Sequence, residues 1–521
     1  MPKQYSGQKK LKKKLNQLHN KQQTTNKEIQ EAPENEILPE CPEEFSKLEL
    51  RPEIIKALEA MELKKMTKIQ HSAIPYALKG HDLMASAKTG SGKTLAFLIP
   101  LVNNVLRLNL QPHNGTGAIV ISPTRELSIQ TYGVLRELIQ FTKIRTGLIM
   151  GGNNRQSETQ NLEKGVTILV ATPGRLLDHL SNSDSIIIHN LKMLVVDEAD
   201  RMLDIGFELE MQQILKLIPK TRQTLLFSAT INDKTRALAK SALKADCMMI
   251  GVDDDCNEAT VDGLEQGYVV CSPERKFCLL YTFLKKNKDK KNMVFMSSCM
   301  EVKFYYELLN YIDMPVLAIH GRQKQSKRTT TFLQFCKDDV ATLLCTDVGA
   351  RGLDIPKVDW ILQYDPPDDA KEYIHRVGRT ARAGSEGNSL LVLRPHEMDF
   401  LDILKKAKVK LVEFEIAQSK MIDAQPALEK LISTNYYLAS SAQEAFKGMV
   451  RTYASHTLTE CFNVAQLDLA AAARTCGLTE IPKVDLNVNY SKKNEKALKR
   501  YLPHNMDQEK LKKAKIYRKI K

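Results

Sequence analysis

The feature that most constrains the fold is a repeated alternation of short apolar runs with segments of helical periodicity. The first series of runs covers residues 83–85, 118–121, 147–150, 167–170, 193–196 and 224–227. The second series covers residues 293–295, 316–319, 342–344, 360–362 and 390–392. Apolar strands that alternate with helices are typical of parallel sheets with both faces covered. The sequence therefore predicts an α/β chain with two tandem parallel-sheet domains.

Changes in composition predict where these domains begin and end. Residues 246–262 are polar and lack periodicity, which is typical of a linker. Beyond residue 420 the pattern becomes helical, with one apolar face formed by Ala442, Ala445, Phe446, Met449, Val450 and Tyr453. The expected parts are a disordered basic and acidic tail (1–40), a first domain (41–250), a linker (251–262), a second domain (263–410), a helical extension (411–490) and a basic tail (491–521).

The charge of the chain is concentrated at its ends. The net charge is +14, yet residues 1–27 hold eight lysines and no acidic residue, and residues 491–521 hold twelve basic and three acidic residues. Such tails suit binding to polyanions or nuclear import. The alternative is that they are solvated, disordered ends that only aid solubility.

Several classes of protein are disfavoured by what the sequence lacks. No stretch approaches the ~20 apolar residues of a membrane helix, and the lysine-rich start has no apolar core of a secretory signal. The ten cysteines include no Cys-x-x-Cys pair, which favours free thiols in a reducing compartment.

A phosphate-binding loop follows the first apolar run and precedes a helical segment. Gly90 and Gly92 allow the backbone to bend, so that several N–H groups can point at one phosphate. Lys93 can reach the β- and γ-phosphates, and the Thr94 hydroxyl can bind Mg²⁺. The predicted loop consists of Ala87, Lys88, Thr89, Gly90, Ser91, Gly92, Lys93 and Thr94. Because the second domain contains no such loop, we expect the nucleotide site in the cleft between the two domains.

An acidic segment follows the run 193–196 and reads Asp197-Glu198-Ala199-Asp200. Acidic residues at the carboxyl end of a buried strand lie where parallel sheets bind ligands. Asp197 is suited to hold Mg²⁺, partly through water, and Glu198 to orient and deprotonate an attacking water. A solvated acidic turn is the alternative, and the phosphate-binding loop upstream disfavours it.

Further motifs in a fixed order show that the chain resembles the DEAD-box ATP-dependent RNA helicases over about residues 45–400. They are Gln70 with Phe45 upstream, 123–127 (Pro-Thr-Arg-Glu-Leu), Gly151-Gly152, 172–175 (Thr-Pro-Gly-Arg), 228–230 (Ser-Ala-Thr), Gln325 with Arg328, 346–354 and 375–382. The resemblance implies two RecA-like domains, ATP with Mg²⁺, and RNA as a partner.

The resemblance also implies roles for individual residues at the nucleotide. The ATP-binding set adds Phe45, Gln70, Asp347, Arg379 and Arg382 to the phosphate-binding loop. The catalytic set is Lys93, Asp197, Glu198, Arg379 and Arg382, and the Mg²⁺ set is Thr94 and Asp197. A glutamine amide offers both a donor and an acceptor to adenine, which predicts ATP over GTP. The two arginines lie on the second domain, so we expect hydrolysis to require domain closure.

The RNA-facing motifs are rich in Thr, Gly and Arg and poor in aromatic residues. Such residues suit phosphate and ribose contacts, which predicts little sequence preference and discrimination through the 2′-OH. The RNA-binding set is Pro123, Thr124, Arg125, Gly152, Thr172, Gly174, Arg175, Arg322, Gln325, Arg328, Thr346 and Arg351. The residues implied to couple ATP to RNA are Asp200, Ser228, Thr230 and His375.

Three residues depart from the pattern of the family. Leu63 stands where an aromatic residue usually packs on adenine, Met66 replaces a proline, and Gly349 replaces an alanine. None of these changes removes a catalytic group.

The region after residue 420 resembles the C-terminal extension of nucleolar DEAD-box helicases that serve large ribosomal subunit assembly. The segments that carry this resemblance are 428–431, 435–438, 453–456 and 467–470. It implies a nuclear and nucleolar location, with pre-ribosomal RNA and pre-ribosomal particle proteins as partners and no membrane. The alternative is a helical addition from another RNA-processing helicase.

The sequence thus predicts an RNA-stimulated ATPase that clamps RNA and locally unwinds short duplexes in rRNA processing. An ATP-timed clamp or scaffold in another RNA-processing pathway is the second hypothesis. A DNA translocase is disfavoured because the motif series indicates local action.

Overall fold

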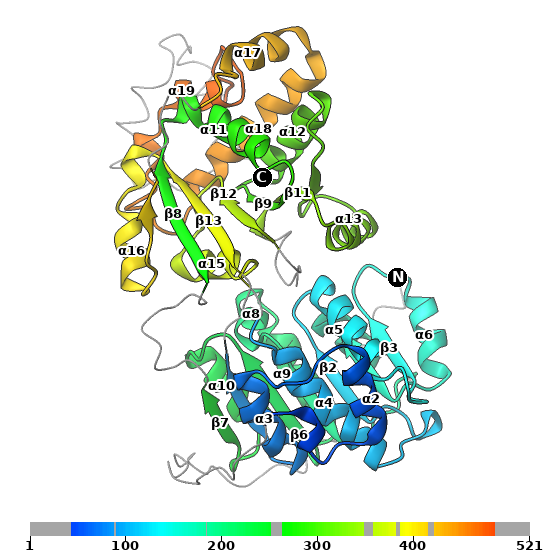
Figure 1. The fold of residues 1–521 in the computed structure, drawn as a ribbon. Coiled ribbons are helices and arrows are strands. Elements are labelled where there is room, and N and C mark those ends of the chain that lie inside the picture. Colours follow the sequence, from blue (N-terminus) through cyan, green and yellow to red (C-terminus); the bar gives the residue numbers. More distant parts are fainter. Residues whose placement is uncertain are drawn as a thin grey trace, which may run out of the picture.

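The computed structural model describes residues 43–87, 90–183, 185–251, 263–347, 358–381, 386–414 and 421–484. We call residues 43–251 the first domain, 263–414 the second domain and 421–484 the extension, each with the gaps just given. Figure 1 shows the two domains one above the other, with the extension on the side of the second domain away from the first. Among the described residues no helix is long and apolar enough to span a membrane.

The first domain is built on a seven-stranded parallel sheet of order β3-β4-β2-β5-β6-β1-β7. Its strands are β1 (Leu83–Ser86), β2 (Ala118–Ile121), β3 (Thr146–Ile149), β4 (Ile168–Ala171), β5 (Met193–Val196), β6 (Gln223–Ser228) and β7 (Met248–Gly251). The described helices are η1 (Phe45–Lys47), α2 (Pro52–Ala60), α3 (Lys68–Leu78), α4 (Lys93–Arg107), η2 (Pro112–Asn114), α5 (Arg125–Leu138), α6 (Arg155–Glu163), α7 (Pro173–Asn182), α8 (Ala199–Asp204), α9 (Glu208–Leu217) and α10 (Asp233–Ala242).

Apolar residues cover both faces of this sheet. Alternate residues of a strand point to opposite faces, and in β1 Leu83 and Ala85 join the cluster that contains α2 to α5, while Met84 joins the cluster that contains α7 to α10. The continuous apolar runs of the sequence therefore arise because the strands are buried on both sides.

The second domain repeats this architecture with the strand order β10-β11-β9-β12-β13-β8-β14, again all parallel. Its strands are β8 (Leu264–Val270), β9 (Lys291–Phe295), β10 (Leu317–Ile319), β11 (Ala341–Cys345), β12 (Trp360–Gln363), β13 (Gly387–Leu393) and β14 (Val412–Glu413). The described helices are η3 (Pro273–Arg275), α11 (Lys276–Lys286), α12 (Cys299–Tyr311), α13 (Gln325–Lys337), α15 (Ala370–Val377), η4 (Pro395–Glu397) and α16 (Phe400–Lys406).

The extension consists of helices that pack onto the second domain. They are α17 (Gln425–Thr434), α18 (Tyr436–Ala454), η6 (Val464–Gln466) and α19 (Leu469–Thr475). The apolar face predicted for α18 is buried, and it shares one cluster with α11 and α12. A Cβ on Gly448 would lie 2.6 Å from Ser298 Oγ, so glycine lets α18 approach the start of α12 closely. The α19 helix ends before Gly477, whose φ of +73° is a backbone conformation that favours glycine.

Three strands differ from the sequence-based prediction. Met248–Gly251 forms β7 at the edge of the first sheet, although residues 246–262 were expected to be a linker. The strand β8 was missed because its first half is polar, and the two-residue β14 lies beyond the expected 263–410. All three lie at or next to a sheet edge, where burial is incomplete and the apolar signal is weak. The two tails and residues 252–262 lie outside the described residues.

Candidate functional site

The phosphate-binding loop lies between β1 and α4, as the sequence predicts. Gly92 precedes α4 with φ of +95°, and Gly90 has φ of +79°. Lys93 is buried, and its Nζ donates a hydrogen bond to the Ala87 carbonyl oxygen at 2.7 Å. Ser91 and Thr94 are partly buried on either side. The loop thus brings together the Lys93 cation and the first N–H groups of α4, an arrangement that suits an anion. Lys88 and Thr89 lie outside the described residues.

Gln70 is joined directly to this loop. Its Nε2 donates to the Gly92 carbonyl oxygen at 3.0 Å, and its Oε1 accepts from Thr67 N at 2.9 Å. A Cβ on Gly92 would lie 2.6 Å from Gln70 Nε2, so the contact requires glycine. Phe45 is buried in the same apolar cluster that Leu63 and Met66 flank, so these two departures from the family pattern are packed rather than exposed.

The acidic segment begins directly after β5, at the carboxyl-terminal side of the sheet, where the phosphate-binding loop follows β1. Asp197 Oδ1 accepts a hydrogen bond from Glu198 N at 2.9 Å. The backbone of Glu198 has a φ of +47°. Its carboxylate forms an ion pair with Arg201, whose Nη1 lies 2.8 Å from Glu198 Oε2. Both side chains of this pair are buried, so Arg201 fixes the direction of the Glu198 carboxylate.

The pKa values of the two neighbouring carboxylates are shifted in opposite directions. Burial and the Glu198 charge raise the pKa of Asp197 to about 7, against the opposing effect of Lys93. Burial acts to raise the pKa of Glu198 as well, but Arg201 and Arg379 outweigh it and lower this pKa to about 2. A cation bound beside Asp197 would favour its ionised form, so this residue fits a role in holding Mg²⁺.

Asp200 connects the acidic segment to the end of β6. Its Oδ2 accepts from the N and Oγ1 of Thr230 at 3.0 and 2.8 Å. Ser228 Oγ accepts from Asp200 N at 3.3 Å and donates to the Thr230 carbonyl oxygen at 2.7 Å. The structure thus brings together three of the four residues expected to couple ATP to RNA. The fourth, His375, lies in α15, where its Nδ1 is 3.7 Å from Glu372 Oε2.

The helix α15 presents the second domain's cations to this site. Arg376 is fully buried and binds Asp347 through two contacts, Nε to Oδ1 at 2.6 Å and Nη2 to Oδ2 at 2.7 Å. Arg379 follows the helix. Burial and the Arg201 charge lower the pKa of Arg379 to about 10, while Glu198 acts in the opposite direction. The guanidinium therefore lies within electrostatic reach of the Glu198 carboxylate on the other domain.

Among the described residues, side chains of the two domains meet between α8 and α15 and between α5 and α13. Figure 1 shows α15 above α8 and α13 above α5. At the α8–α15 contact, Lys371 Nζ lies 2.6 Å from Asp204 Oδ2. At the α5–α13 contact, Glu126 Oε1 lies 2.7 Å from Arg328 Nη2 and accepts from Gln325 Nε2 at 2.9 Å.

The α5–α13 contact also involves Arg125, whose Nη1 donates to Gln325 Oε1 at 3.1 Å. Burial lowers the pKa of Arg125 below its usual range. The space above Gly151 and Gly152 is occupied by the Arg125 guanidinium, and a Cβ on Gly152 would lie 2.6 Å from its Nη1. The glycine pair thus allows the arginine to reach across toward the second domain.

A buried carboxylate organises the neighbouring loops of the first domain. Glu158 Oε1 accepts from Met150 N at 3.1 Å, and its Oε2 lies 3.1 Å from His179 Nε2 and 3.3 Å from Arg175 Nη1. Arg175 also donates from Nη2 to the Asn153 carbonyl oxygen at 3.1 Å. Glu158 therefore links the loop after β3 to the start of α7.

The other members of the predicted RNA-binding set follow the carboxyl ends of strands in the two sheets. Pro123 is buried, Thr124 caps α5 by accepting from Leu127 N at 3.3 Å, and Thr172 Oγ1 accepts from Gly151 N at 3.4 Å. Gly174 and Arg322 are exposed and Thr346 is buried. Arg351, Arg382 and Gly349 lie outside the described residues.

Sequence reasoning missed several residues that the structure places in the site. They are Glu126, Glu158, His179, Arg201, Asp204, Lys371 and Arg376. Glu126, Arg201 and Arg376 stand inside or directly after recognised motifs, which was an available signal. The others lie on helices whose charged residues look like ordinary solvated surface in the sequence.

Three family models match the chain. The model described as "DEAD/DEAH box helicase" matches residues 67–238, and "Helicase conserved C-terminal domain" matches residues 275–384. The model "ATP-dependent rRNA helicase SPB4-like, C-terminal extension" matches residues 435–484.

Individual relatives show the same similarity. ATP-dependent RNA helicase DDX18 of Homo sapiens is 60% identical over 436 residues, which cover 84% of this chain and 65% of that protein. This chain therefore spans less than two thirds of the human relative. ATP-dependent RNA helicase HAS1 of Saccharomyces cerevisiae is 50% identical over 481 residues, covering 92% of this chain and 95% of HAS1.

A solved structure of Mss116p, bound to ssRNA and AMP-PNP, is similar with a TM-score of 0.74 and 28% identity, and the similarity covers 86% of this chain and 92% of that one. The family models, the relatives and the fold agree. The chain therefore belongs to the DEAD-box RNA helicase family and carries an SPB4-like C-terminal extension.

Proposed function

We propose that this protein is an RNA-stimulated ATPase that clamps RNA across its two domains and locally separates short duplexes. The observation that carries the proposal is the direct contact between the domains, Lys371 with Asp204 and Arg328 with Glu126, which brings Arg379 into the electrostatic range of Glu198. Arg379 and Glu198 come from different domains, so the hydrolytic site is complete only when the domains are together. The α8–α15 and α5–α13 contacts support such a closed arrangement.

The residues around the phosphate-binding loop fit ATP with Mg²⁺. Lys93 and the first N–H groups of α4 would bind the phosphates, and Thr94 with Asp197 would hold the metal ion. When bound, Mg²⁺ neutralises charge on the phosphate oxygens. Gln70 is held against the loop, where its amide would recognise adenine. Phe45 would support that edge of the base site.

Hydrolysis requires a positioned water molecule and a cation close to the phosphoryl group on which negative charge develops. Glu198 would orient the attacking water by accepting its hydrogen bond and would then take its proton. Arg201 keeps the carboxylate ionised and fixed in direction. Arg379 stabilises the charge that develops on the transferred phosphoryl group, as an arginine finger supplied from the same chain.

RNA would promote hydrolysis because its binding surface spans both domains. Arg125 and Arg175 from the first domain and Gln325 and Arg328 from the second offer guanidinium and amide donors for phosphates and riboses. RNA lying across α5 and α13 would hold the domains together. The Asp200–Thr230 hydrogen bonds link the acidic segment to the coupling motif after β6.

The proposed setting is rRNA processing and large ribosomal subunit assembly in the nucleolus. The SPB4-like extension supports an rRNA substrate, because the matched family is described as an rRNA helicase. Pre-ribosomal RNA and proteins of the pre-ribosomal particle are the proposed partners. The two basic ends of the sequence would add phosphate contacts whose strength depends on salt.

The proposal is tested by measuring ATP hydrolysis with no nucleic acid, with single-stranded RNA and with single-stranded DNA of the same sequence. We expect stimulation by RNA and little by DNA. Glu198→Gln is the matched control, which should bind ATP and RNA but lose turnover. Stimulation by DNA equal to that by RNA would contradict the proposal. Binding of ATP and RNA without stimulated hydrolysis would favour a scaffold instead.

A further inference from the structure

Side chains of the extension hold the turn that leads into α15. This turn covers residues 365–369 and connects β12 to α15. His456 Nε2 lies 3.2 Å from the Pro367 carbonyl oxygen, and Thr457 Oγ1 donates to the Asp368 carbonyl oxygen at 2.7 Å. Two consecutive carbonyl groups of the turn are therefore bound by two consecutive residues that follow α18.

The hydrogen bonding of His456 identifies the proton on its ring. Leu458 N donates to His456 Nδ1 at 3.2 Å, so Nδ1 carries no proton. In a neutral ring the proton then lies on Nε2, which donates to the Pro367 carbonyl oxygen. The ring is buried and lies 3.9 Å from the Phe462 ring, centroid to centroid, which fixes its orientation.

The middle of the turn has few hydrogen-bond donors of its own. Pro366 and Pro367 have no backbone N–H group, so neither can donate a hydrogen bond. Both prolines are buried, and buried carbonyl groups require partners. The extension supplies the partner of the buried Pro367 carbonyl group and a second bond to the carbonyl group of the exposed Asp368, which makes it part of the local structure rather than a covering layer.

What the turn holds is the helix that carries the arginine finger. Asp369 caps α15 by accepting from Glu372 N at 2.7 Å, and the helix runs from Ala370 to Val377. Eight helical residues span about 12 Å. Arg379 follows within two residues, so a displacement of the turn would be transmitted along one short helix to its guanidinium.

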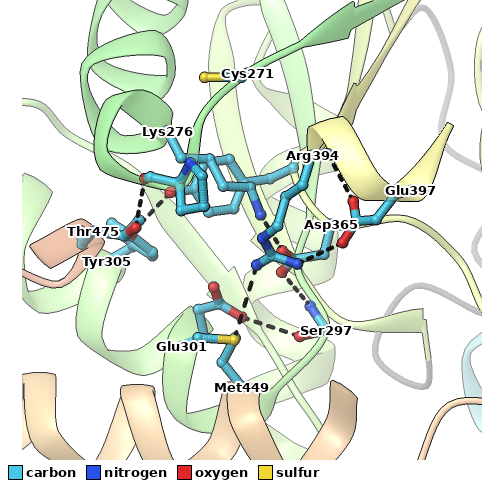
Figure 2. Close-up of polar contacts among 12 residues, drawn as sticks. Cys271, Lys276, Ser297, Glu301, Tyr305, Asp365, Arg394, Glu397, Met449 and Thr475 are labelled. Carbon is cyan, nitrogen blue, oxygen red and sulfur yellow. Dashed lines mark hydrogen bonds and ion pairs between the residues drawn. The ribbon is translucent and has the colours of Figure 1, made fainter. Parts of the chain in front are cut away.

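The opposite end of the turn is anchored in the core of the second domain, as Figure 2 shows. The Asp365 carboxylate forms an ion pair with Lys276, and its Oδ2 accepts from Ser297 N at 2.9 Å. The Asp365 carbonyl oxygen accepts from Arg376 Nη1 at 2.6 Å. Figure 2 also shows Met449 of the extension approaching Arg394 in this network.

A pocket brings the extension beside the ion pair of Asp347 and Arg376. It is lined from the second domain by these two residues and Asp365, and from the extension by Met449, Tyr453 and His456. The start of the turn is thus fixed by the core, while its end at Pro367 and Asp368 is fixed by the extension.

We propose that His456 and Thr457 are positioning residues for ATP hydrolysis. By holding the Pro367 and Asp368 carbonyl groups they set the direction of α15 and place Arg379 against Glu198. This inference rests on the proposed function and makes the extension a working part of the ATPase site.

The test compares steady-state ATP hydrolysis at saturating RNA in full-length variants. In His456→Ala/Thr457→Val both donors are lost, and we expect kcat to fall about tenfold while KM for ATP changes less than about twofold. His456→Gln keeps an amide donor near the position of Nε2 and should stay within about twofold of the parent kcat. Thr457 is exposed, so Thr457→Val alone preserves the fold and should lower kcat about threefold.

His396→Ala is the matched control. His396 Nε2 and Tyr453 OH lie 2.9 Å apart, so this change breaks a contact between the second domain and the extension that does not involve the carbonyl groups of the turn. Thermal unfolding is recorded for every variant. We expect His396→Ala to lose stability without losing kcat.

Unchanged kcat in Thr457→Val and in the double variant would overturn the inference. An equal fall in kcat for His396→Ala and the double variant would also overturn it, because the extension would then act only through stability. If the parent chain shows no RNA-stimulated hydrolysis, the proposed function fails and the inference fails with it.

Discussion

Lys371 Nζ, at the start of α15, lies 2.6 Å from Asp204 Oδ2, at the end of α8. The helix that leads to Arg379 is therefore tied to the helix that follows Glu198. The ion pair is partly exposed, with side-chain accessibilities of 30% and 44%. It acts as a closing contact that forms only when the domains meet.

This pair predicts a charge-swap result. Because partly exposed ion pairs contribute about 0.2–1 kcal/mol, Lys371→Glu should lower RNA-stimulated kcat/KM about two- to fivefold at low salt. The double variant Lys371→Glu/Asp204→Lys should recover most of the loss. Steady-state assays at two salt concentrations measure this. Equal losses in the single and double variants would show that Lys371 acts through another residue.

A second prediction concerns Glu126 in the α5–α13 contact. Glu126→Gln removes the charge that pairs with the Arg328 guanidinium 2.7 Å away. We expect affinity for single-stranded RNA in the presence of a non-hydrolysable ATP analogue to fall about tenfold, the effect of losing about 1.4 kcal/mol. Nucleotide-free affinity should change less than about twofold, because this contact needs both domains together. Fluorescence anisotropy separates the two conditions, and an equal loss in both would place the role of Glu126 within the first domain alone.

A third prediction concerns Glu158, which binds Met150 N, His179 and Arg175 at once. Glu158→Ala leaves buried polar groups without partners, so the free energy of unfolding should fall by about 2–4 kcal/mol. RNA affinity should fall as well, because Arg175 loses its orientation. Arg155→Ala in the same helix breaks an exposed pair with Asp178 and an exposed hydrogen bond to the Asn182 carbonyl oxygen, and it serves as the control. Chemical denaturation and RNA titration measure the two effects, and loss of stability with unchanged RNA affinity would separate Glu158 from RNA binding.

A fourth prediction follows from the raised pKa of Asp197, about 7 in the folded protein. The folded state holds this proton more tightly than the unfolded state, so the contribution of Asp197 to stability is present at low pH. It is lost as pH rises from about 4, the ordinary pKa of an aspartate, to about 7. Asp197→Asn should therefore become more stable than the parent as pH rises through this window, by an amount on the order of 1–4 kcal/mol. Denaturation at pH 5 and pH 8 without nucleotide measures the difference, and a pH-independent difference would contradict the assignment.

The sequence was sufficient to predict the sheets because their strands are buried on both faces. The runs 118–121 and 193–196 coincide with β2 and β5, since no solvent-facing side interrupts their apolar residues. The strand β8 was missed because Glu265 and Gln266 break the apolar pattern at its start. Gln266 is buried, and its amide oxygen accepts a hydrogen bond from the Tyr373 hydroxyl, a tertiary contact that has no local signal.

Site residues also divide into those with a local sequence signal and those set by tertiary contacts. The positions of Lys93, Asp197 and Asp200 were predictable, because the motifs that contain them directly follow the apolar runs that form β1 and β5. The partners Lys371 and Asp204 were not, because pairing between two domains depends on how the domains meet and not on spacing along one chain.

The most direct test of the central claim is single-turnover ATP hydrolysis by Arg379→Ala at saturating RNA, compared with the parent chain. The claim is that the hydrolytic site is assembled from both domains, with Arg379 facing Glu198. It predicts that the rate constant falls at least about 100-fold, while ATP affinity changes little, because an arginine finger acts on the transition state. A rate constant within about threefold of the parent would contradict the account.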